Sequence, residues 1–329
     1  MGFIIVLAAP VFFLSIALEW WWGWRQARRG QTTAQAYRLD DAISSISLGI
    51  MSQLSAVFTR VFRVTIYTLA YEQIALFPNE GFWWSWYGVL IALVLYDLCY
   101  YAYHRASHEV AVFWAGHVVH HQSQHYNLST ALRQTTSGVV LGWVYYLPMA
   151  LLGVSPLVFG IVALIDLLYQ FWVHTEHVGK LGWFDRWFCS PSNHRVHHAV
   201  NDAYVDRNYG GIWVVWDRLF GSFKEEDPQE PCVYGTRKPL QSWDPLWANW
   251  QVWAGLLHDS WHARRWADKL RVWWRHPGWR PADVAERFPM PAFSLAATSR
   301  FEPSQTPQQL QWAVGWFVLL LGEIGRAHV

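Results

Sequence analysis

The sequence predicts an all-α protein: a polytopic bundle of membrane-spanning helices with a histidine-rich helical cap on its cytoplasmic side. Of the 329 residues, 53% are hydrophobic and only 15% are charged, whereas soluble domains average about 25% charged residues. Long apolar runs recur along the chain, and 11 of the 15 histidines lie between His104 and His198. The formal net charge of +1 gives no field that would attract nucleic acid, so we expect no nucleic-acid partner.

Five apolar runs approach or exceed the roughly 20 helical residues that cross a bilayer core. Three arginines follow the first run, residues 3–22, rather than preceding it, which favours a retained span over a cleaved signal peptide. The second run, residues 43–71, contains Arg60 and Arg63, which are costly in hydrocarbon unless they pair or reach the headgroups. The other three predicted spans are residues 83–103, 135–152 and 157–173.

The basic residues near the span ends predict the orientation of the bundle. The loop after the first span contains Arg25, Arg28, Arg29 and Arg38, whereas the loop at residues 72–83 has no lysine or arginine. We therefore expect the first loop to be cytoplasmic and the second to lie outside. Following the spans from there brings every histidine cluster to the cytoplasmic face of a bacterial inner membrane or of the endoplasmic reticulum.

Composition divides the chain into four parts. The third part, residues 225–310, mixes Trp and Leu with basic residues. This composition suits interfacial helices in the headgroup region, or a soluble cap whose aromatic side chains pack inward. The last seven residues, from Glu323, read like a translated sequencing adapter. We therefore expect the natural chain to continue beyond Gly322, and we exclude His328 from functional reasoning. The parts are an N-terminal span and basic loop (1–40), a membrane domain with the histidines (41–224), the Trp-rich helical segment (225–310) and a truncated C-terminal span (311–329).

Nine histidines fall into three spaced motifs and one single position. Residues i and i+4 share one face of a helix, so an HxxxH motif can bind one metal. Adjacent histidines differ by about 100° around a helix, so one member of each HH pair can face one metal and its neighbour another. The nine are His104 and His108 (HxxxH), His117, His120 and His121 (HxxHH), His194, His197 and His198 (HxxHH), and His174.

The number of ligands predicts two metals. A catalytic zinc takes about three protein ligands and an octahedral metal about six, so nine imidazoles are too many for one ion. Imidazole suits Zn, Cu, Fe and Ni, so ligand type alone does not select iron. A lone histidine is more often a surface or packed residue than a ligand, which is how we interpret His258, His262 and His276. His125 and His177 lie outside the repeating spacings and are left open as ligands.

Further segments surround these motifs. They are DLCYYAYHRASHE at 97–109, YNLSTALRQ at 126–134, QFWVHTE at 170–176, PSNHRVHH at 191–198, NYGG at 208–211 and WDRLFG at 216–221. Together the motifs and segments resemble the fatty acid hydroxylase superfamily, also called the sterol desaturase family, over roughly residues 40–280. The resemblance is closest to its alkylglycerol monooxygenase-like and bacterial sterol desaturase-like members.

The resemblance implies a centre of two non-haem irons that activates O2 to hydroxylate, desaturate or oxidatively cleave a lipid, whether a fatty acyl chain, a sterol or an ether lipid. The nine histidines match the metal motifs of the family, and His174 matches the histidine of its HTE motif. Electrons must come from a separate donor, because no flavin or dinucleotide motif is evident. The closest relatives depend on tetrahydrobiopterin, and no residue pattern here indicates a site for it.

The candidate catalytic residues are Asp97, Glu176 and Asn127. Carboxylates near the histidines are expected to orient the imidazole rings. An acid inside a span is a functional hypothesis by default, which singles out Asp97. The other nearby carboxylates are Glu109, Asp202, Asp206 and Asp217.

Three readings compete with the lipid oxygenase. A desaturase or carotenoid hydroxylase would use the same centre. A histidine-rich membrane metal transporter or sensor is the alternative from another class, but a transporter would place its ligands near the bilayer midplane, whereas these follow the span ends. A zinc hydrolase would need fewer ligands and an acid/base carboxylate.

Overall fold

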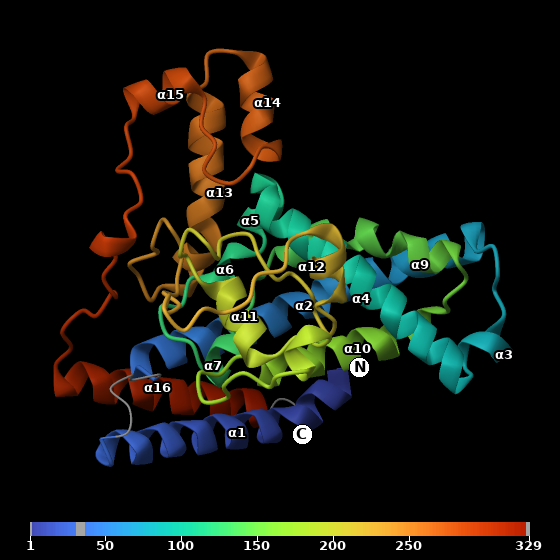
Figure 1. The fold of residues 1–329 in the computed structure, drawn as a ribbon, viewed down its shortest axis with the longest axis horizontal. Helices are drawn as coiled ribbons and strands as arrows, with labels where there is room; N and C mark the ends of the chain where they lie inside the picture. Colours follow the sequence, from blue (N-terminus) through green and yellow to red (C-terminus); the bar gives the residue numbers. More distant parts are fainter. Residues whose placement is uncertain (1, 31–36, 327–329) are drawn as a thin grey trace.

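The computed structural model describes residues 2–30 and 37–326, and this part of the chain is mostly helical, with two isolated β-bridges and no strand. The long apolar helices extend along the long axis of the molecule (Figure 1). They are α1 (Gly2–Arg28), α2 (Leu39–Ile74), α4 (Trp86–Glu109), α10 (Pro156–Trp172) and α16 (Pro307–Arg326). By length and composition, Leu39–Thr59 and Trp86–Glu109 are able to cross a membrane.

Local sequence explains where these helices begin. The side chain of Ser85 caps α4 by accepting a hydrogen bond from Gly88 N at 3.1 Å. Pro156 occupies the first turn of α10, where its missing N–H costs nothing. The preceding turn contains Gly153, which has a φ of +89° and whose added Cβ would lie 2.2 Å from Phe77 O, so only glycine fits there.

The fourth predicted span differs from expectation because it is broken. It consists of α8 (Gly138–Gly142), a 3₁₀ turn (η1, Trp143–Tyr146) and α9 (Leu147–Leu151). Pro148 has no N–H to donate to the carbonyl one turn before it, which weakens the helix there, and the chain tightens into the 3₁₀ turn.

The main apolar core lies between α2, α4, α9 and α10. Tyr67 and Tyr96 are buried there against Met149 and Val158, and the hydroxyl of Tyr67 donates to Val154 O at 2.9 Å. A second cluster contains Leu48, Val118, Val119, Leu240 and Ala248. It joins α2 to the segment that carries the second histidine motif.

The outward faces of the long helices are strongly apolar. Phe58 on α2 is 80% exposed, Trp86 at the start of α4 is 79% exposed, and Trp312 on α16 is 68% exposed. Monomeric soluble proteins rarely expose contiguous apolar surface of this extent, whereas hydrocarbon would cover it favourably. The described part of the structure does not include the side chains of Arg60 and of residues 323–326. It also excludes residues 327–329, and with them His328.

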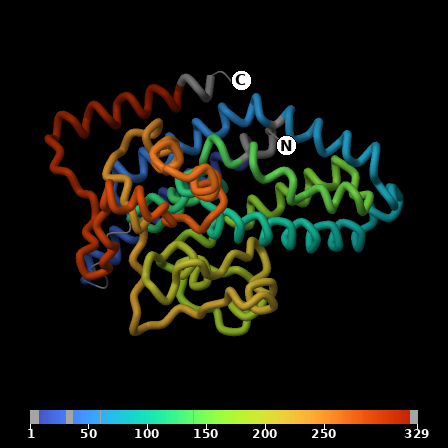
Figure 2. Tube along the Cα trace, turned by 90° about the horizontal axis from the view of Figure 1, so that it is seen from above, coloured from blue at the N-terminus to red at the C-terminus, as the bar shows by residue number. Residues whose placement is uncertain are grey.

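Most of the remaining helices are short, and all except α3 lie away from the α3 end of the bundle (Figure 1). The helices α13 (Pro245–His262), α14 (Trp266–Trp274) and α15 (Ala282–Arg287) project away from the long axis (Figure 1). The segment between α11 and α13, coloured yellow, forms a lobe on one side (Figure 2). The other short helices are α3 (Glu80–Trp83), α5 (Ala111–Ala115), α6 (Val118–His121), α7 (Leu128–Ala131), α11 (Pro191–His198) and α12 (Val215–Phe220).

Candidate metal centre

The nine predicted histidines converge into two adjoining groups. Within each group, one ligand atom from every histidine lies within 4.8 Å of those of the others. Eight of the nine side chains are buried and His117 is half-buried. The first group holds His104, His108, His117, His121 and His197, and the second holds His120, His174, His194 and His198.

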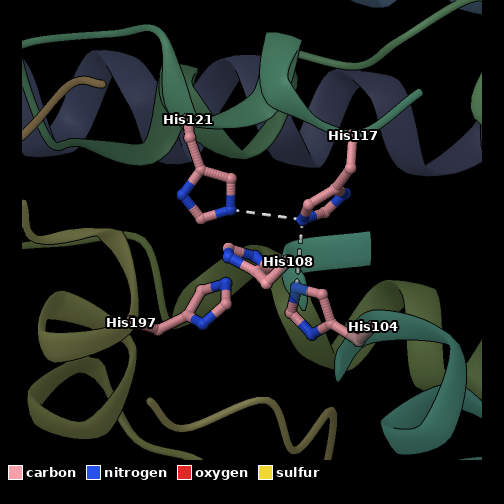
Figure 3. A group of neighbouring side chains, drawn as sticks. All are labelled: His104, His108, His117, His121 and His197. Atoms are coloured by element: carbon pink, nitrogen blue, oxygen red, sulfur yellow. Dashed lines mark hydrogen bonds between the residues drawn. The ribbon is translucent and has the colours of Figure 1, made fainter. Parts of the chain in front are cut away.

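Helical geometry distributes the histidines between the groups. His104 and His108 are one turn apart near the end of α4, and His117 precedes the single turn of α6. In Figure 3, His117 and His121 approach from one side and His104, His108 and His197 from the other, with ring nitrogens pointing inward. The adjacent pairs divide, with His121 in the first group and His120 in the second. This is the separation that the offset of about 100° per residue predicts.

Backbone carbonyls orient four of the rings. In each case the ring Nδ1 lies within hydrogen-bond distance of a carbonyl oxygen, which can only accept, so Nδ1 carries the proton. The Nε2 atom of the neutral ring is then left with a bare lone pair, the form that binds metals. The four Nδ1 atoms are those of His104 (Tyr209 O, 2.8 Å), His120 (Arg133 O, 3.0 Å), His174 (Gln170 O, 2.8 Å) and His197 (Arg207 O, 2.9 Å).

Two of these bare nitrogens face each other directly. The Nε2 atoms of His120 and His174 are 3.1 Å apart, although both rings donate from Nδ1 to carbonyls. Two lone pairs at this distance repel unless a cation lies beside them. The Nε2 atoms of His108 and His197 are buried and have no hydrogen-bond partner among the described residues. These donor atoms therefore fit a bound metal.

Protonation of the imidazoles does not relieve this repulsion at neutral pH. Burial lowers the pKa of His120 to about 4, and burial followed by repulsion from neighbouring imidazoles lowers the pKa of His174 well below its usual value. The same causes act on His117, His121, His194, His197 and His198. Neutral imidazoles are good metal ligands, so the electrostatics favour metal binding over protonation.

The loop at residues 206–211 presents two of the orienting carbonyls. Asp206 and Asn208 adopt left-handed backbone conformations, with φ of 58° and 56°, which these two residue types tolerate better than most. They flank Arg207, so the chain turns the carbonyls of Arg207 and Tyr209 toward the histidines.

Two buried carboxylates fix this loop. Asp217 accepts hydrogen bonds from Tyr209 N at 2.7 Å and Gly210 N at 2.8 Å. Asp97, on α4, accepts from Ile212 N at 2.6 Å and from the indole of Trp216 at 2.7 Å. Both acids therefore act on His104 through the backbone of the loop.

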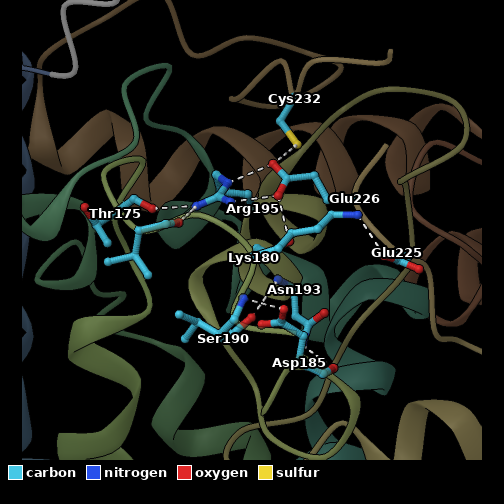
Figure 4. Close-up of polar contacts among 12 residues, drawn as sticks. Thr175, Lys180, Asp185, Ser190, Asn193, Arg195, Glu225, Glu226 and Cys232 are labelled. Carbon is cyan, nitrogen blue, oxygen red and sulfur yellow. Dashed lines mark hydrogen bonds and ion pairs between the residues drawn. The ribbon is translucent and has the colours of Figure 1, made fainter. Parts of the chain in front are cut away.

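A second set of polar contacts holds α11, the helix of the third motif (Figure 4). Arg195 donates to both carboxylate oxygens of Glu226, at 2.8 and 2.7 Å, and to Thr175 O at 3.0 Å. Asn193 donates to Phe188 O at 3.1 Å. Because Thr175 follows His174, the guanidinium of Arg195 connects the histidines of α11 to the one that follows α10.

The three candidate catalytic residues lie around the centre rather than among the imidazoles. Asp97 contacts residues 212–216 and is hydrogen-bonded to Asp166 on α10. Asn127 caps α7 and accepts from Ser129 N at 3.0 Å. Glu176 is half-buried and hydrogen-bonded to Tyr234, and burial raises the pKa of its carboxyl. Their assignment as catalytic residues stays a prediction.

The other five histidines that the structure describes belong to neither group. His125 is buried and approaches Glu302 at 3.9 Å, and His177 is exposed beside Gly23. The projecting segment contains His258, His262 and His276. The side chain of His258 is 42% exposed and that of His276 is 56% exposed. The sequence did not reveal the orienting carbonyls, which belong to residues 133, 170, 207 and 209. Every residue has a backbone carbonyl, so the amino-acid sequence cannot single out these four.

A cleft of about 550 Å³ opens from the histidines toward α13. His108, His121, His197 and His198 form part of its lining, so both groups contribute to it. The remaining lining comes from α5, α6, α13 and the segments at residues 199–206, 235–238 and 276–290. The centre is therefore buried but reachable.

Comparisons with known proteins agree with this geometry. The family model for fatty acid hydroxylases matches residues 89–222, which contain all nine histidines. An alkylglycerol monooxygenase of Homo sapiens is 38% identical over 247 residues, 74% of this chain and 54% of that protein. The one from Danio rerio is 34% identical over 321 residues, 95% of this chain and 68% of that protein. An ornithine lipid hydroxylase of Rhizobium tropici is 29% identical over 187 residues, 54% of each chain. No solved structure matches.

The chain therefore belongs to the fatty acid hydroxylase superfamily. Its relatives are named as monooxygenases, hydroxylases and an oxidase, all of them oxidoreductases, which agrees with the predicted enzyme class. The chain spans 54% of the human and 68% of the Danio rerio alkylglycerol monooxygenase.

Proposed function

We propose that the chain is a membrane-bound, non-haem di-iron oxygenase that uses O2 to oxidise a lipid. The observation that carries this proposal is the pair of buried imidazole groups, five and four in number, in which bare Nε2 atoms face one another. Five and four ligands each suit one metal ion, whereas nine exceed what one ion takes. The relatives named as alkylglycerol monooxygenases make an alkylglycerol-type ether lipid the first substrate to test.

Iron is favoured over zinc by the reaction class. The relatives are oxygenases and oxidases by name, and such reactions need a metal that changes oxidation state, which zinc does not. Two bound irons would supply the electrons that activate O2 toward a C–H bond. The electrons consumed in each turnover would come from a separate donor protein or cofactor.

The residues of the chain hold the reacting groups and exclude water. The carbonyls of Arg133, Gln170, Arg207 and Tyr209 fix four imidazole orientations through Nδ1. Burial keeps the rings neutral and able to bind metal. Asp97 and Asp217 hold the loop that carries Tyr209, so the geometry is present before the substrate arrives.

The membrane orientation is part of the proposal. The apolar outer faces of α1, α2, α4 and α16 support a multi-pass bundle, and the arginines after α1 support a cytoplasmic location for the histidine end of α4. That location would give the centre access to cytoplasmic electron carriers.

Isotopically labelled O2 tests the function. Protein purified in lipid nanodiscs, loaded with ferrous iron and supplied with a chemical reductant, is incubated with ether lipids, fatty acyl lipids and sterols. Mass spectrometry is expected to find labelled oxygen in a lipid product, and the His198→Ala variant is expected to give none. If no lipid of the panel is oxidised while the same protein carries iron across sealed vesicles, the transporter reading replaces the oxygenase.

A further inference from the structure

The cleft that reaches the histidines has one wall made by α13. Val252 and Leu256 of α13 line it together with Trp114 of α5 and Val118 of α6. Phe288 and Met290 continue the apolar lining beyond α13. A hydrocarbon chain in this cleft would contact these apolar side chains and lie beside the imidazoles.

Charged side chains also line the cleft, and most of them are paired. Arg280 contacts Asp259 at 2.6 Å, and His276 contacts Asp206 at 2.8 Å. A lining that is mostly apolar with a few polar groups is the usual composition of a site for a small amphiphile. The volume of about 550 Å³ lies within the range of roughly 300–1,000 Å³ that such sites occupy.

Gly255 leaves a gap in the α13 wall. It lies on α13 between Val252 and Leu256 and lines the cleft. A Cβ added there would meet no atom within 4 Å, so no neighbouring group requires glycine, although glycine is unfavourable inside a helix. The space beside Gly255 is available to a ligand.

We propose that the hydrocarbon chain of a single-chain lipid lies in this cleft against α13, and that Gly255 sets how bulky a chain the cleft accepts. This inference rests on the proposed function, because it assigns the substrate site of the same centre.

A second pocket is the main competing location. It has a volume of about 850 Å³ and is lined by Phe77, Phe82, Trp83, Ile91 and Leu95, among others. Leu95, its lining residue nearest to His104 on α4, precedes His104 by nine residues, roughly 13 Å at 1.5 Å per residue. A chain bound there is too far from the imidazoles to react, so the cleft beside α13 is favoured.

Photolabelling locates the chain without any turnover. A single-chain lipid with a diazirine on its hydrocarbon tail is irradiated with the protein in nanodiscs under anaerobic conditions, and labelled peptides are mapped by mass spectrometry. Label is expected in the peptide that contains residues 248–256. Label confined to the peptides around residues 77–95 would overturn the proposal.

Substitutions at Gly255 test its role. Gly255→Phe is expected to reduce labelling of the α13 peptide at least about tenfold by filling the space, with Gly255→Ala intermediate. Gly315→Phe is the matched control, because Gly315 also lies within a helix, on α16, and has open space beside it. That variant is expected to label like the wild type. Thermal unfolding and iron content check that the variants fold.

The two proposals fail separately. Undiminished labelling in a folded Gly255→Phe variant would overturn the role of Gly255 whatever the activity. Correct labelling of an iron-loaded protein that oxidises no lipid would overturn the oxygenase function and leave the binding site standing.

Discussion

At the scale of single residues, the centre depends on groups that hold the imidazoles as much as on the imidazoles themselves. Arg195 stands between His194 and His197 on α11 and is nearly buried, with 8% of its side chain exposed. Its guanidinium binds both oxygens of Glu226 and two backbone carbonyls. Removing one partner of a buried ion pair leaves the other charge uncompensated, which costs more than the pair itself contributes.

Glu226→Gln is expected to lower the free energy of unfolding by about 2–3 kcal/mol. The matched control is Glu225→Gln, which breaks the ion pair between Glu225 and Lys180. The side chain of Lys180 is 39% exposed and that of Glu225 is 72% exposed. Such a surface pair contributes below about 1 kcal/mol. Chemical or thermal unfolding in detergent micelles measures both. Equal losses in the two variants would contradict the role assigned to Arg195 and Glu226.

The effect of Glu226→Gln should also depend on pH. Burial raises the pKa of the Glu226 carboxyl, but hydrogen bonds from Arg195 and Ser192 outweigh it, so the folded-state pKa lies below the usual 4.5. The ion pair therefore stabilises the fold fully above pH 4.5, and this contribution is lost as the pH falls through the folded-state pKa. The stability difference between wild type and variant should be constant near neutral pH and shrink on acidification.

At the scale of elements, the apolar runs predicted the helices α1, α2, α4 and α10 well, and two of these, within α2 and α4, are long and apolar enough to cross a membrane. The fourth span was the exception. Its composition reads as one helix, but Pro148 interrupts the hydrogen bonding of the preceding turn, and Tyr103 packs against Gly142, where a Cβ would lie 2.8 Å from the ring. The second effect depends on how two helices meet, which the sequence of neither reveals.

The histidine spacings predicted the site better than the fold around it. Periodicity alone assigned His120 and His121 to different metals, and the structure separates them into different groups. The partners of the rings were not predictable, since the carbonyls of Arg133 and Tyr209 become ligand-orienting groups only when the loops fold. The cleft beside Gly255 arises likewise from segments far apart in the sequence.

The ends of α4 give a test of the membrane orientation. Glu80 lies before α4 and Gln229 lies beyond the histidine motifs, and both are exposed. In intact cells, a membrane-impermeant thiol reagent is expected to label Glu80→Cys directly and Gln229→Cys only after permeabilisation. Both substitutions are made in a variant whose natural cysteines have been replaced by serine or alanine, so that only the introduced thiol reacts. Labelling of both positions from the same side would contradict the proposed path of the chain.

At the scale of the whole molecule, the bundle and the projecting helices serve one arrangement. The long helices α4 and α10 deliver His104, His108 and His174 to one end of the bundle. The lobe after α11 supplies the carbonyls that orient two rings. The helix α13 closes one side of the cleft. The two imidazole groups thus form where the three parts meet, and the central claim is that each group binds one iron.

Metal analysis combined with Mössbauer spectroscopy of the iron-loaded protein tests that claim most directly. We expect two irons per chain with signals of two different sites, because one group has five imidazoles and the other four. His120→Ala and His121→Ala should each perturb mainly the site of its own group, whereas His262→Ala should match the wild type. A single iron per chain, or two irons that remain unperturbed in both variants, would contradict the account.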